Sequence, residues 1–133
     1  MKSLSLQAKL YFGATLITGG LLAVLQMSRL DGQHLALLVV ACVLASLYQA
    51  MRTEGAKPTS SYSLSWIVYG VTFLLLGIPE TVLVILVAHA VEWFWYRYTW
   101  EIQSFNTAAF VITATIAGLF YELAMAGQWL SSF

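Results

Sequence analysis

Charged residues are scarce in this chain of 133 residues. Only 9% of the residues are charged and 60% are hydrophobic, whereas a soluble domain carries about 25% charged and about 45–50% apolar residues. The shortage of charge excludes an ordinary water-soluble domain. A polar, loop-rich stretch that would separate a second compact unit is missing as well. We therefore expect a single transmembrane domain over residues 1–133.

Clustered cations are also missing. The six Lys and Arg residues are balanced by six acidic residues and stand one or two at a time between apolar runs. Phosphate binding needs several cations close together. Nucleic acid is therefore not an expected partner, and the expected surroundings are the lipid bilayer.

Cysteine and catalytic motifs are nearly absent. Cys42 is the only cysteine, so an internal disulfide is excluded and the redox compartment stays undetermined. The sequence has no GxSxG, HExxH, CxxC or Walker motif and no paired-carboxylate constellation, and its two histidines lie far apart. We therefore expect no enzymatic activity and no cofactor.

The first apolar run, from Leu10 to Met27, is not typical of a cleaved signal peptide. It has about 18 residues, whereas the hydrophobic region of a signal peptide has about 7–15. No small-x-small cleavage pattern follows it. We interpret it as a retained membrane span.

Apolar residues gather in five stretches with short polar breaks between them. In hydrocarbon, each backbone N–H and C=O must find a partner within its own segment, and the alternating strands of a barrel are absent. The pattern predicts an all-α integral membrane bundle of about five transmembrane helices. The stretches are Leu10 to Met27, Leu35 to Met51, Leu64 to Leu76, Thr81 to Tyr96 and Ala108 to Leu130.

The third and fourth stretches are short, because a full crossing usually takes about 20 apolar residues. Extending the third stretch back to Tyr62 and the fourth stretch forward to Tyr98 nearly restores that length. We therefore expect two crossings rather than a re-entrant loop. Gly77 and Pro79 predict a tight hairpin between them, since Gly ends helices and Pro begins them.

The charge distribution predicts the orientation. Cations are enriched in inner loops of membrane proteins, and an N-terminus inside the cell leaves only Arg29 in an outer segment. Five crossings then place the C-terminus outside. The inner cations are Lys2, Lys9, Arg52, Lys57 and Arg97.

Aromatic residues agree with this orientation, because Trp and Tyr favour the headgroup level of a membrane. One group lies beside Arg97 at the proposed inner interface, and Trp129 lies near the outer end of the fifth stretch. An internal aromatic core or cofactor box is the alternative interpretation. The inner group consists of Trp93, Trp95, Tyr96, Tyr98 and Trp100.

Three ionisable residues lie within the apolar stretches. His89 and Glu92 are three positions apart, hence on one helical face, and Glu122 lies in the fifth stretch. Charge inside a bilayer is costly and marks a candidate functional site. A ligand-sensing or proton-responsive role and a structural role in interhelical hydrogen bonds both remain open. A metal site is not expected, because the predicted depths of Glu92 and Glu122 differ.

Small residues recur at helix-packing spacing. Gly19 and Ala23 lie four apart in the first stretch, as do Ala114 and Gly118 in the fifth. Such pairs let helix backbones approach closely in lipid. Packing inside one bundle and a homodimer face are the two interpretations.

Residues 63–118 carry a family resemblance. Ser63-Leu64-Ser65 opens an apolar helix, a tight Gly77-Ile78-Pro79-Glu80 turn leads into a second, and Phe105-Asn106 precedes a helix that reaches Ala117-Gly118. This pattern resembles the N-terminal membrane region of bacterial signalling proteins whose cytoplasmic parts are HD-GYP phosphodiesterases or GGDEF diguanylate cyclases acting on cyclic di-GMP.

The resemblance implies a location in the bacterial inner membrane and a role for Asn106 in capping or bracing the fifth helix. The HD-GYP and GGDEF motifs are absent from the sequence, so no catalytic residue is implied. In that family another helix leads back inside before the soluble domain. We therefore expect the chain to be a fragment of a longer protein or a stand-alone relative.

These observations favour a non-catalytic, membrane-integral sensory or anchoring module of a bacterial signalling protein. A small membrane subunit of a transporter, of the substrate-binding energy-coupling type, is the alternative, together with an accessory subunit of an energy-converting membrane complex. Expected partners are the bilayer and a second copy or a larger membrane protein.

Overall fold

The computed structural model describes residues 5–51, 53–54, 61–97 and 99–131, with residues 53, 54, 61, 62 and 128–131 described by their backbone only. Lys2, Arg52, Lys57 and Tyr98, which support the predicted orientation, and the side chain of Trp129 lie outside this description. The orientation of the chain in a membrane therefore stays a prediction.

Five α-helices make up most of the described chain, which confirms the predicted all-α class. A single 3-10 turn, η1 (Gly32–His34), precedes the second helix, and two-residue strands β1 (Thr53–Glu54) and β2 (Ser61–Tyr62) pair antiparallel. The helices are α1 (Leu6–Met27), α2 (Leu35–Ala50), α3 (Ser65–Leu76), α4 (Ile78–Tyr96) and α5 (Trp100–Ser131).

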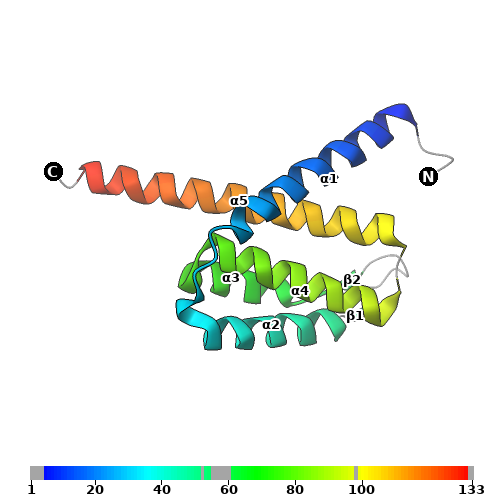
Figure 1. The fold of residues 1–133 in the computed structure, drawn as a ribbon, viewed down its shortest axis with the longest axis horizontal. Coiled ribbons are helices and arrows are strands. Elements are labelled where there is room, and N and C mark those ends of the chain that lie inside the picture. The colour runs from blue at the N-terminus through cyan, green and yellow to red at the C-terminus, as the bar shows by residue number, and fades with distance from the viewer. Residues whose placement is uncertain (1–4, 52, 55–60, 98, 132–133) are drawn as a thin grey trace.

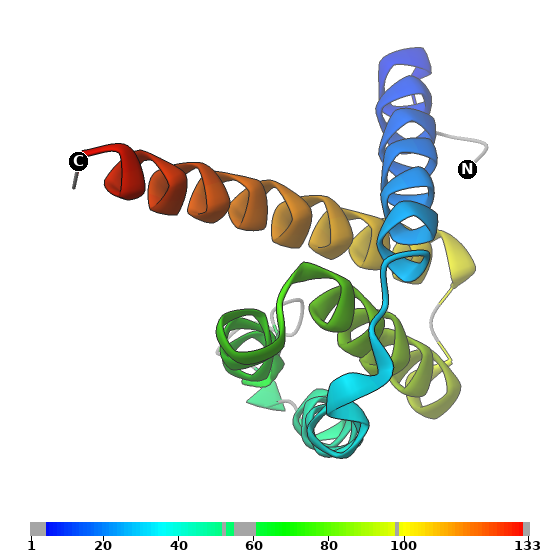
Figure 2. The same cartoon turned by 60° about the vertical axis from the view of Figure 1, so that its left-hand side comes forward.

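The helices form two groups. Helices α2, α3 and α4 pack together as a three-helix bundle, and α1 and α5 cross each other above it (Figure 1). Seen from a second direction, α1 stands steeply against α5 (Figure 2). The second half of α5 extends beyond the bundle, and its residues 119–127 are exposed.

Helix α4 holds the centre of the fold. Its residues Val82, Val84, Ile85 and Ala88 are almost completely buried, and Val111 of α5 packs into the same core. Helix α4 contacts each of the other four helices. The position of α4 therefore decides where α5 and the bundle meet.

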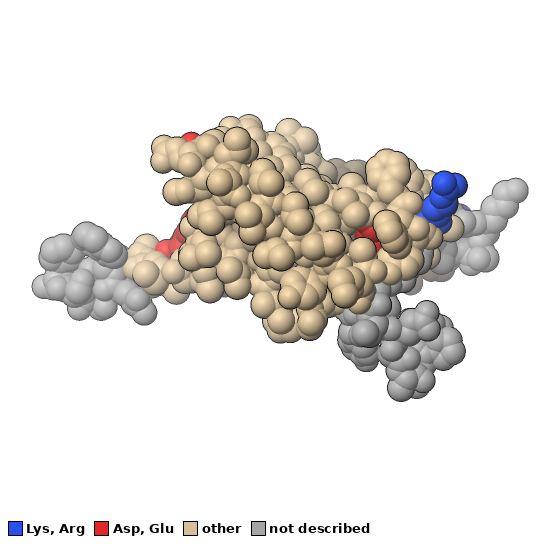
Figure 3. All heavy atoms as spheres, turned by 90° about the horizontal axis from the view of Figure 1, so that it is seen from below, with Lys and Arg blue, Asp and Glu red and all other residues tan. Residues whose placement is uncertain are grey.

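The outer surfaces are apolar. Four segments, Leu6–Met27, Gly32–Ala50, Ile78–Tyr96 and Trp100–Gly127, are long and apolar enough to cross a membrane. On the face shown in Figure 3, charged side chains occupy only a few small spots of the described surface. Large apolar surfaces of this kind are costly in water and are compatible with lipid contact.

Helix α3 is shorter than expected. It begins at Ser65, and Tyr62 belongs to β2, so the predicted extension of this helix back to Tyr62 is wrong. The hydroxyl of Ser63 accepts a hydrogen bond from the Ser65 amide at 3.1 Å, which supports the start of the helix at this point. At about 1.5 Å per residue, α3 is about 18 Å long, less than the roughly 30 Å of a bilayer core.

Helix α5 is longer than expected. It begins at Trp100 rather than at Ala108, because the polar residues before Ala108 continue the helix instead of forming a loop. Asn106 lies inside this helix and is exposed, so the expectation that it caps the helix start is wrong. Helix α1 also starts earlier, at Leu6, where the Ser5 hydroxyl accepts a hydrogen bond from the helix backbone.

The predicted hairpin between the third and fourth helices is confirmed. Gly77 ends α3 and directly precedes α4, and Pro79 lies in the first turn of α4. Gly77 has a φ of 104°, a conformation that side chains with a Cβ rarely adopt.

Two of the predicted packing glycines lie at helix contacts within the chain. A Cβ added to Gly19 of α1 would be 2.6 Å from the Ala108 Cβ of α5. A Cβ added to Gly118 would be 2.4 Å from the Ile78 side chain of α4. Ala23 and Ala114 are partly buried against the core. These contacts favour packing inside one bundle over a homodimer face.

Replacing Gly19 with Ala is expected to push α1 and α5 apart, because the atoms nearest to the new methyl group include the Ala108 backbone. Overpacking of this kind lowers the free energy of unfolding by about 1–3 kcal/mol. The test is thermal unfolding in detergent. Unfolding is monitored by the reaction of a thiol-reactive dye with Cys42, which is partly buried in the folded protein.

The neighbouring Gly20→Ala is the matched control. A Cβ at Gly20 meets nothing within 4 Å, and Ala is favoured over Gly in a helix by up to about 1 kcal/mol. This variant is expected to be as stable as the wild type or more stable. Equal melting temperatures for both variants would contradict the close crossing of α1 and α5.

Candidate functional site

A group of buried polar side chains lies where four helices meet at one end of the molecule. We call it the polar cluster. It joins the last turn of α2, the first turn of α3, the C-terminal half of α4 and the first turn of α5, and each member is only 2–7% exposed. Its members are Gln49, Ser65, His89, Glu92 and Gln103.

The carboxylate of Glu92 is the centre of the cluster. Its Oε2 atom accepts hydrogen bonds from Gln49 Nε2 at 2.9 Å and from Gln103 Nε2 at 3.0 Å. His89 Nδ1 lies 3.3 Å from the same oxygen. Donors from α2 and α5, together with His89 of α4 itself, therefore surround one buried oxygen.

Gln49 extends the cluster to α3. Its Oε1 atom accepts hydrogen bonds from the hydroxyl of Ser65 and, at 3.0 Å, from that of Ser63. Its amide nitrogen donates to Glu92 at the same time. One carboxamide therefore connects α2 both to the start of α3 and to the centre of α4.

Gln103 joins α5 to α4. Its amide nitrogen donates to the backbone carbonyl of His89 at 2.8 Å and to Glu92 Oε2, and it lies 3.1 Å from His89 Nδ1. The His89 carbonyl and the Glu92 carboxylate both accept hydrogen bonds from this nitrogen, so they set the orientation of the amide. Gln103 Oε1 is buried and has no partner among the described residues.

The distances around His89 Nδ1 favour a proton on this nitrogen. The Gln103 amide has two hydrogens, and its two nearest acceptors are the His89 carbonyl and the Glu92 carboxylate. A bare lone pair on Nδ1, 3.3 Å from the carboxylate oxygen, would be repelled by it. A proton on Nδ1 removes this repulsion and lets Nδ1 donate to the carboxylate.

The other side of the imidazole lies among aromatic rings. The ring centroids of His89 and Phe110 are 5.1 Å apart, and Tyr69 stacks at 6.5 Å. His89 Nε2 and the Tyr69 hydroxyl are buried without a hydrogen-bond partner among the described residues. His89 therefore has one nitrogen, Nδ1, among polar neighbours and one buried nitrogen, Nε2, without a partner among the described residues.

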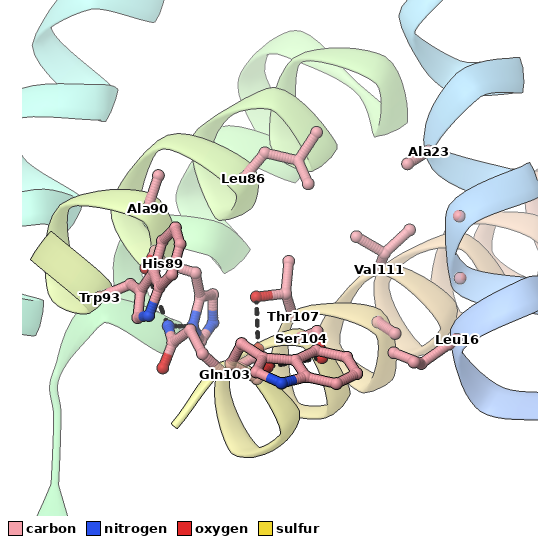
Figure 4. A pocket seen from close by; sticks show the side chains of 14 residues that line it. Leu16, Ala23, Leu86, His89, Ala90, Trp93, Gln103, Ser104, Thr107 and Val111 are labelled. Carbon is pink, nitrogen blue, oxygen red and sulfur yellow. Dashed lines mark hydrogen bonds between the residues drawn. The ribbon is translucent and has the colours of Figure 1, made fainter. Parts of the chain in front are cut away.

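A groove of about 400 Å³ opens beside the cluster, between α1, α4 and α5 (Figure 4). His89 and Gln103 lie at one end of it, and Trp93 and Trp100 also line it. A smaller cavity of about 210 Å³, lined by Tyr69 among others, lies between α3, α4 and α5.

The structure brings together some of the predicted residues and separates others. His89 and Glu92 lie in one cluster, as their spacing on one helical face indicates. Glu122 is exposed in the part of α5 that extends beyond the bundle, so it does not belong to the cluster. In place of a third metal ligand, His89 and Glu92 contact the carboxamides of Gln49 and Gln103.

Sequence reasoning missed Gln49 and Gln103. Gln49 stands near the end of an otherwise apolar run, and Gln103 was expected in a loop because the fifth helix was predicted to begin at Ala108. A lone carboxamide in an apolar helix usually finds an interhelical partner. That rule is the signal that could have identified both residues.

The described tryptophans of the predicted inner aromatic group do not form an internal core. Trp93, Trp95 and Trp100 are exposed, which contradicts the alternative interpretation of these rings as buried. Tyr96 has a bridging role, because its hydroxyl donates a hydrogen bond to the Ala50 carbonyl at 2.6 Å and so joins α4 to α2. Phe105, one of the positions of the family resemblance, stacks on Phe12 of α1.

Comparison of the chain with protein-family models, with curated proteins and with solved structures finds no match. The resemblance to HD-GYP and GGDEF signalling proteins therefore stays a prediction.

Replacing Glu92 with Leu is expected to destabilise the bundle strongly. The buried amide of Gln49 and one hydrogen of the Gln103 amide would lose the carboxylate that accepts from them, at about 1–3 kcal/mol for each donor left unsatisfied. Thermal unfolding in detergent, monitored by Cys42 labelling, measures the loss.

Glu122→Leu is the matched control, because it makes the same substitution at an exposed position of α5. Its effect on the free energy of unfolding is expected to stay within about 0.5 kcal/mol. A Glu92→Leu variant as stable as Glu122→Leu would show that the polar cluster does not hold the helices together.

Proposed function

We propose that this chain is a non-catalytic, membrane-integral sensory module in which the polar cluster couples α5 to the α2–α4 bundle. The observation that carries the proposal is the buried Glu92 carboxylate, held by donors from two other helices. Ionisable groups inside membrane helices are expensive and mark functional sites by default. A module that only anchors a protein in lipid has no need of one.

The position of the cluster suits a switch. Gln103 is the residue through which α5 contacts both His89 and Glu92. When these hydrogen bonds form, the start of α5 is tied to α4. When a ligand or a change in charge breaks them, α5 can shift by the small translations that are typical of switching helices.

The shape of α5 supports this role. Its first half packs on α1 and α4, and residues 119–127 have exposed side chains (Figure 1), although the Tyr121 ring contacts Phe73 of α3 at a centroid distance of 5.4 Å. A change at Gln103 is therefore carried along one continuous helix past this contact to the exposed residues near the end of α5.

The proposal includes a location and an output. We place the module in the bacterial cytoplasmic membrane with the N-terminus inside, because the cations favour that orientation. From the resemblance, the output is the turnover of cyclic di-GMP by a domain outside this sequence.

The sensory role predicts two positions of α5 relative to the bundle. The test uses spin labels at two exposed positions, Leu37→Cys on α2 and Leu123→Cys on α5, in a Cys42→Ser background and in lipid nanodiscs. Pulsed electron–electron double resonance measures the distance between the two labels. Gln103→Leu is expected to shift the mean distance by about 1–2 Å or more.

Glu122→Gln is the control for this measurement, because it neutralises a charge on α5 outside the polar cluster. It is expected to leave the distance distribution unchanged. An identical distribution in the wild type and Gln103→Leu would refute the sensory role and favour an anchor.

The groove favours a second candidate function, a substrate-capturing subunit of a transporter. A concave, mostly apolar site with a few polar groups is typical of binding sites for small molecules. A capture subunit is expected to purify from native membranes together with an ATP-hydrolysing partner, whereas a sensory module is not.

A further inference from the structure

We propose that Tyr69 of α3 is a second hydrogen-bond partner of His89, which the imidazole takes when α5 shifts and Gln103 withdraws. In this second state His89 Nε2 and the Tyr69 hydroxyl bond to each other. The inference rests on the proposed sensory function and assigns Tyr69 as a positioning residue of the same switch.

Two buried polar atoms without partners belong to neighbouring rings. Neither His89 Nε2 nor the Tyr69 hydroxyl has a hydrogen-bond partner among the described residues. The two residues are only 2% and 6% exposed, and their ring centroids lie 6.5 Å apart. Buried polar atoms of proteins are normally paired. The structure therefore holds apart two atoms that could satisfy each other.

The Tyr69 side chain is directed toward the polar cluster. Long side chains on a helix point back toward its N-terminus, over the residue three or four positions earlier. For Tyr69 that residue is Ser65, which belongs to the cluster at the start of α3. The Tyr69 hydroxyl lies close to Ser65 and within electrostatic range of Glu92, although neither pair has the geometry of a hydrogen bond. The hydroxyl is therefore a donor beside the cluster that the present arrangement does not use.

Helix α5 holds the imidazole in its present position. The Gln103 amide nitrogen lies 3.1 Å from His89 Nδ1 (Figure 4), and the ring of Phe110, two turns further along α5, lies 5.1 Å from the imidazole. Tyr69 contacts the same imidazole from α3. A shift of α5 therefore loosens a polar and an aromatic contact together, while the neighbour on α3 stays.

The exchange of partners needs only a turn of the ring. Rotation about the Cβ–Cγ bond of histidine has broad minima, so the imidazole can turn once Gln103 has withdrawn. The new bond forms in either protonation state, because a tyrosine hydroxyl can donate to a bare Nε2 or accept from a protonated one. Gln103 has room to withdraw, since its side chain also lines the groove between α1, α4 and α5.

The first test follows the imidazole itself by nitrogen NMR of the full chain in phosphatidylcholine nanodiscs, with isotopically labelled histidine. The chain has two histidines, and the exposed His34 serves as the internal reference. We expect the His89 Nε2 resonance to move in Gln103→Leu at constant pH, because the nitrogen gains a partner. Adding Tyr69→Phe is expected to return it toward the wild-type position.

Tyr48→Phe is the matched control, because it removes the hydroxyl of an exposed tyrosine on α2. Added to Gln103→Leu, it is expected to leave the His89 resonance where Gln103→Leu puts it.

The second test uses the spin labels on α2 and α5 described above. In Gln103→Leu, the bond between His89 and Tyr69 stabilises the shifted position of α5. Adding Tyr69→Phe is expected to lower the ratio of shifted to unshifted molecules about fivefold, the effect of one net hydrogen bond. Tyr69→Phe alone is expected to leave the wild-type distances unchanged. If Gln103→Leu does not fold, Gln103→Asn, which shortens the side chain and withdraws the amide, replaces it in both tests.

The outcomes separate this inference from the sensory role. A His89 resonance that stays in place in the Gln103 variant, or moves equally with and without the Tyr69 hydroxyl, would overturn the exchange of partners. In that case a shift of α5 in the same variant would leave the sensory role standing. A resonance change that depends on Tyr69 without any shift of α5 would support the exchange and refute the sensory role.

Discussion

The fold depends on one buried negative charge and the donors that surround it. A carboxylate in an apolar interior is tolerated only when hydrogen bonds replace its lost hydration. For Glu92 those bonds come from Gln49 on α2 and Gln103 on α5, with His89 at the third side. Satisfying Glu92 therefore requires α2, α4 and α5 to meet at one point, whereas contacts between purely apolar helix surfaces specify no such point.

The same requirement makes the junction of α4 and α5 sensitive to the loss of the Gln103 hydrogen bonds. Apolar contacts between membrane helices are weakly directional, but the hydrogen bonds of Gln103 are formed or lost as a unit. His89 belongs to this unit through Nδ1 and borders the groove through its ring.

Much of the fold could be predicted from the sequence. The five helices follow from apolar runs, and the α3–α4 hairpin follows from Gly77 and Pro79, because these residues act through local backbone chemistry. The boundaries were less accurate where polar residues continue a helix. The sequence predicted a loop from Trp100 to Thr107. This segment is helical, and Gln103 within it has partners on α4. A partner on another helix cannot be read from hydropathy.

The sequence by itself determined most of the helices of this protein, and it indicated a lipid medium. The low charge and the apolar runs are properties of single segments, and each segment carries them wherever it packs. The pairing of His89 with Glu92 was also local, since both lie on one face of α4. Only the tertiary structure decided that Gln49 and Gln103 complete their site, that Glu122 lies outside it, and that Gly19 meets Ala108 beside an open groove. These facts concern contacts between helices, and their geometry depends on how all five pack together.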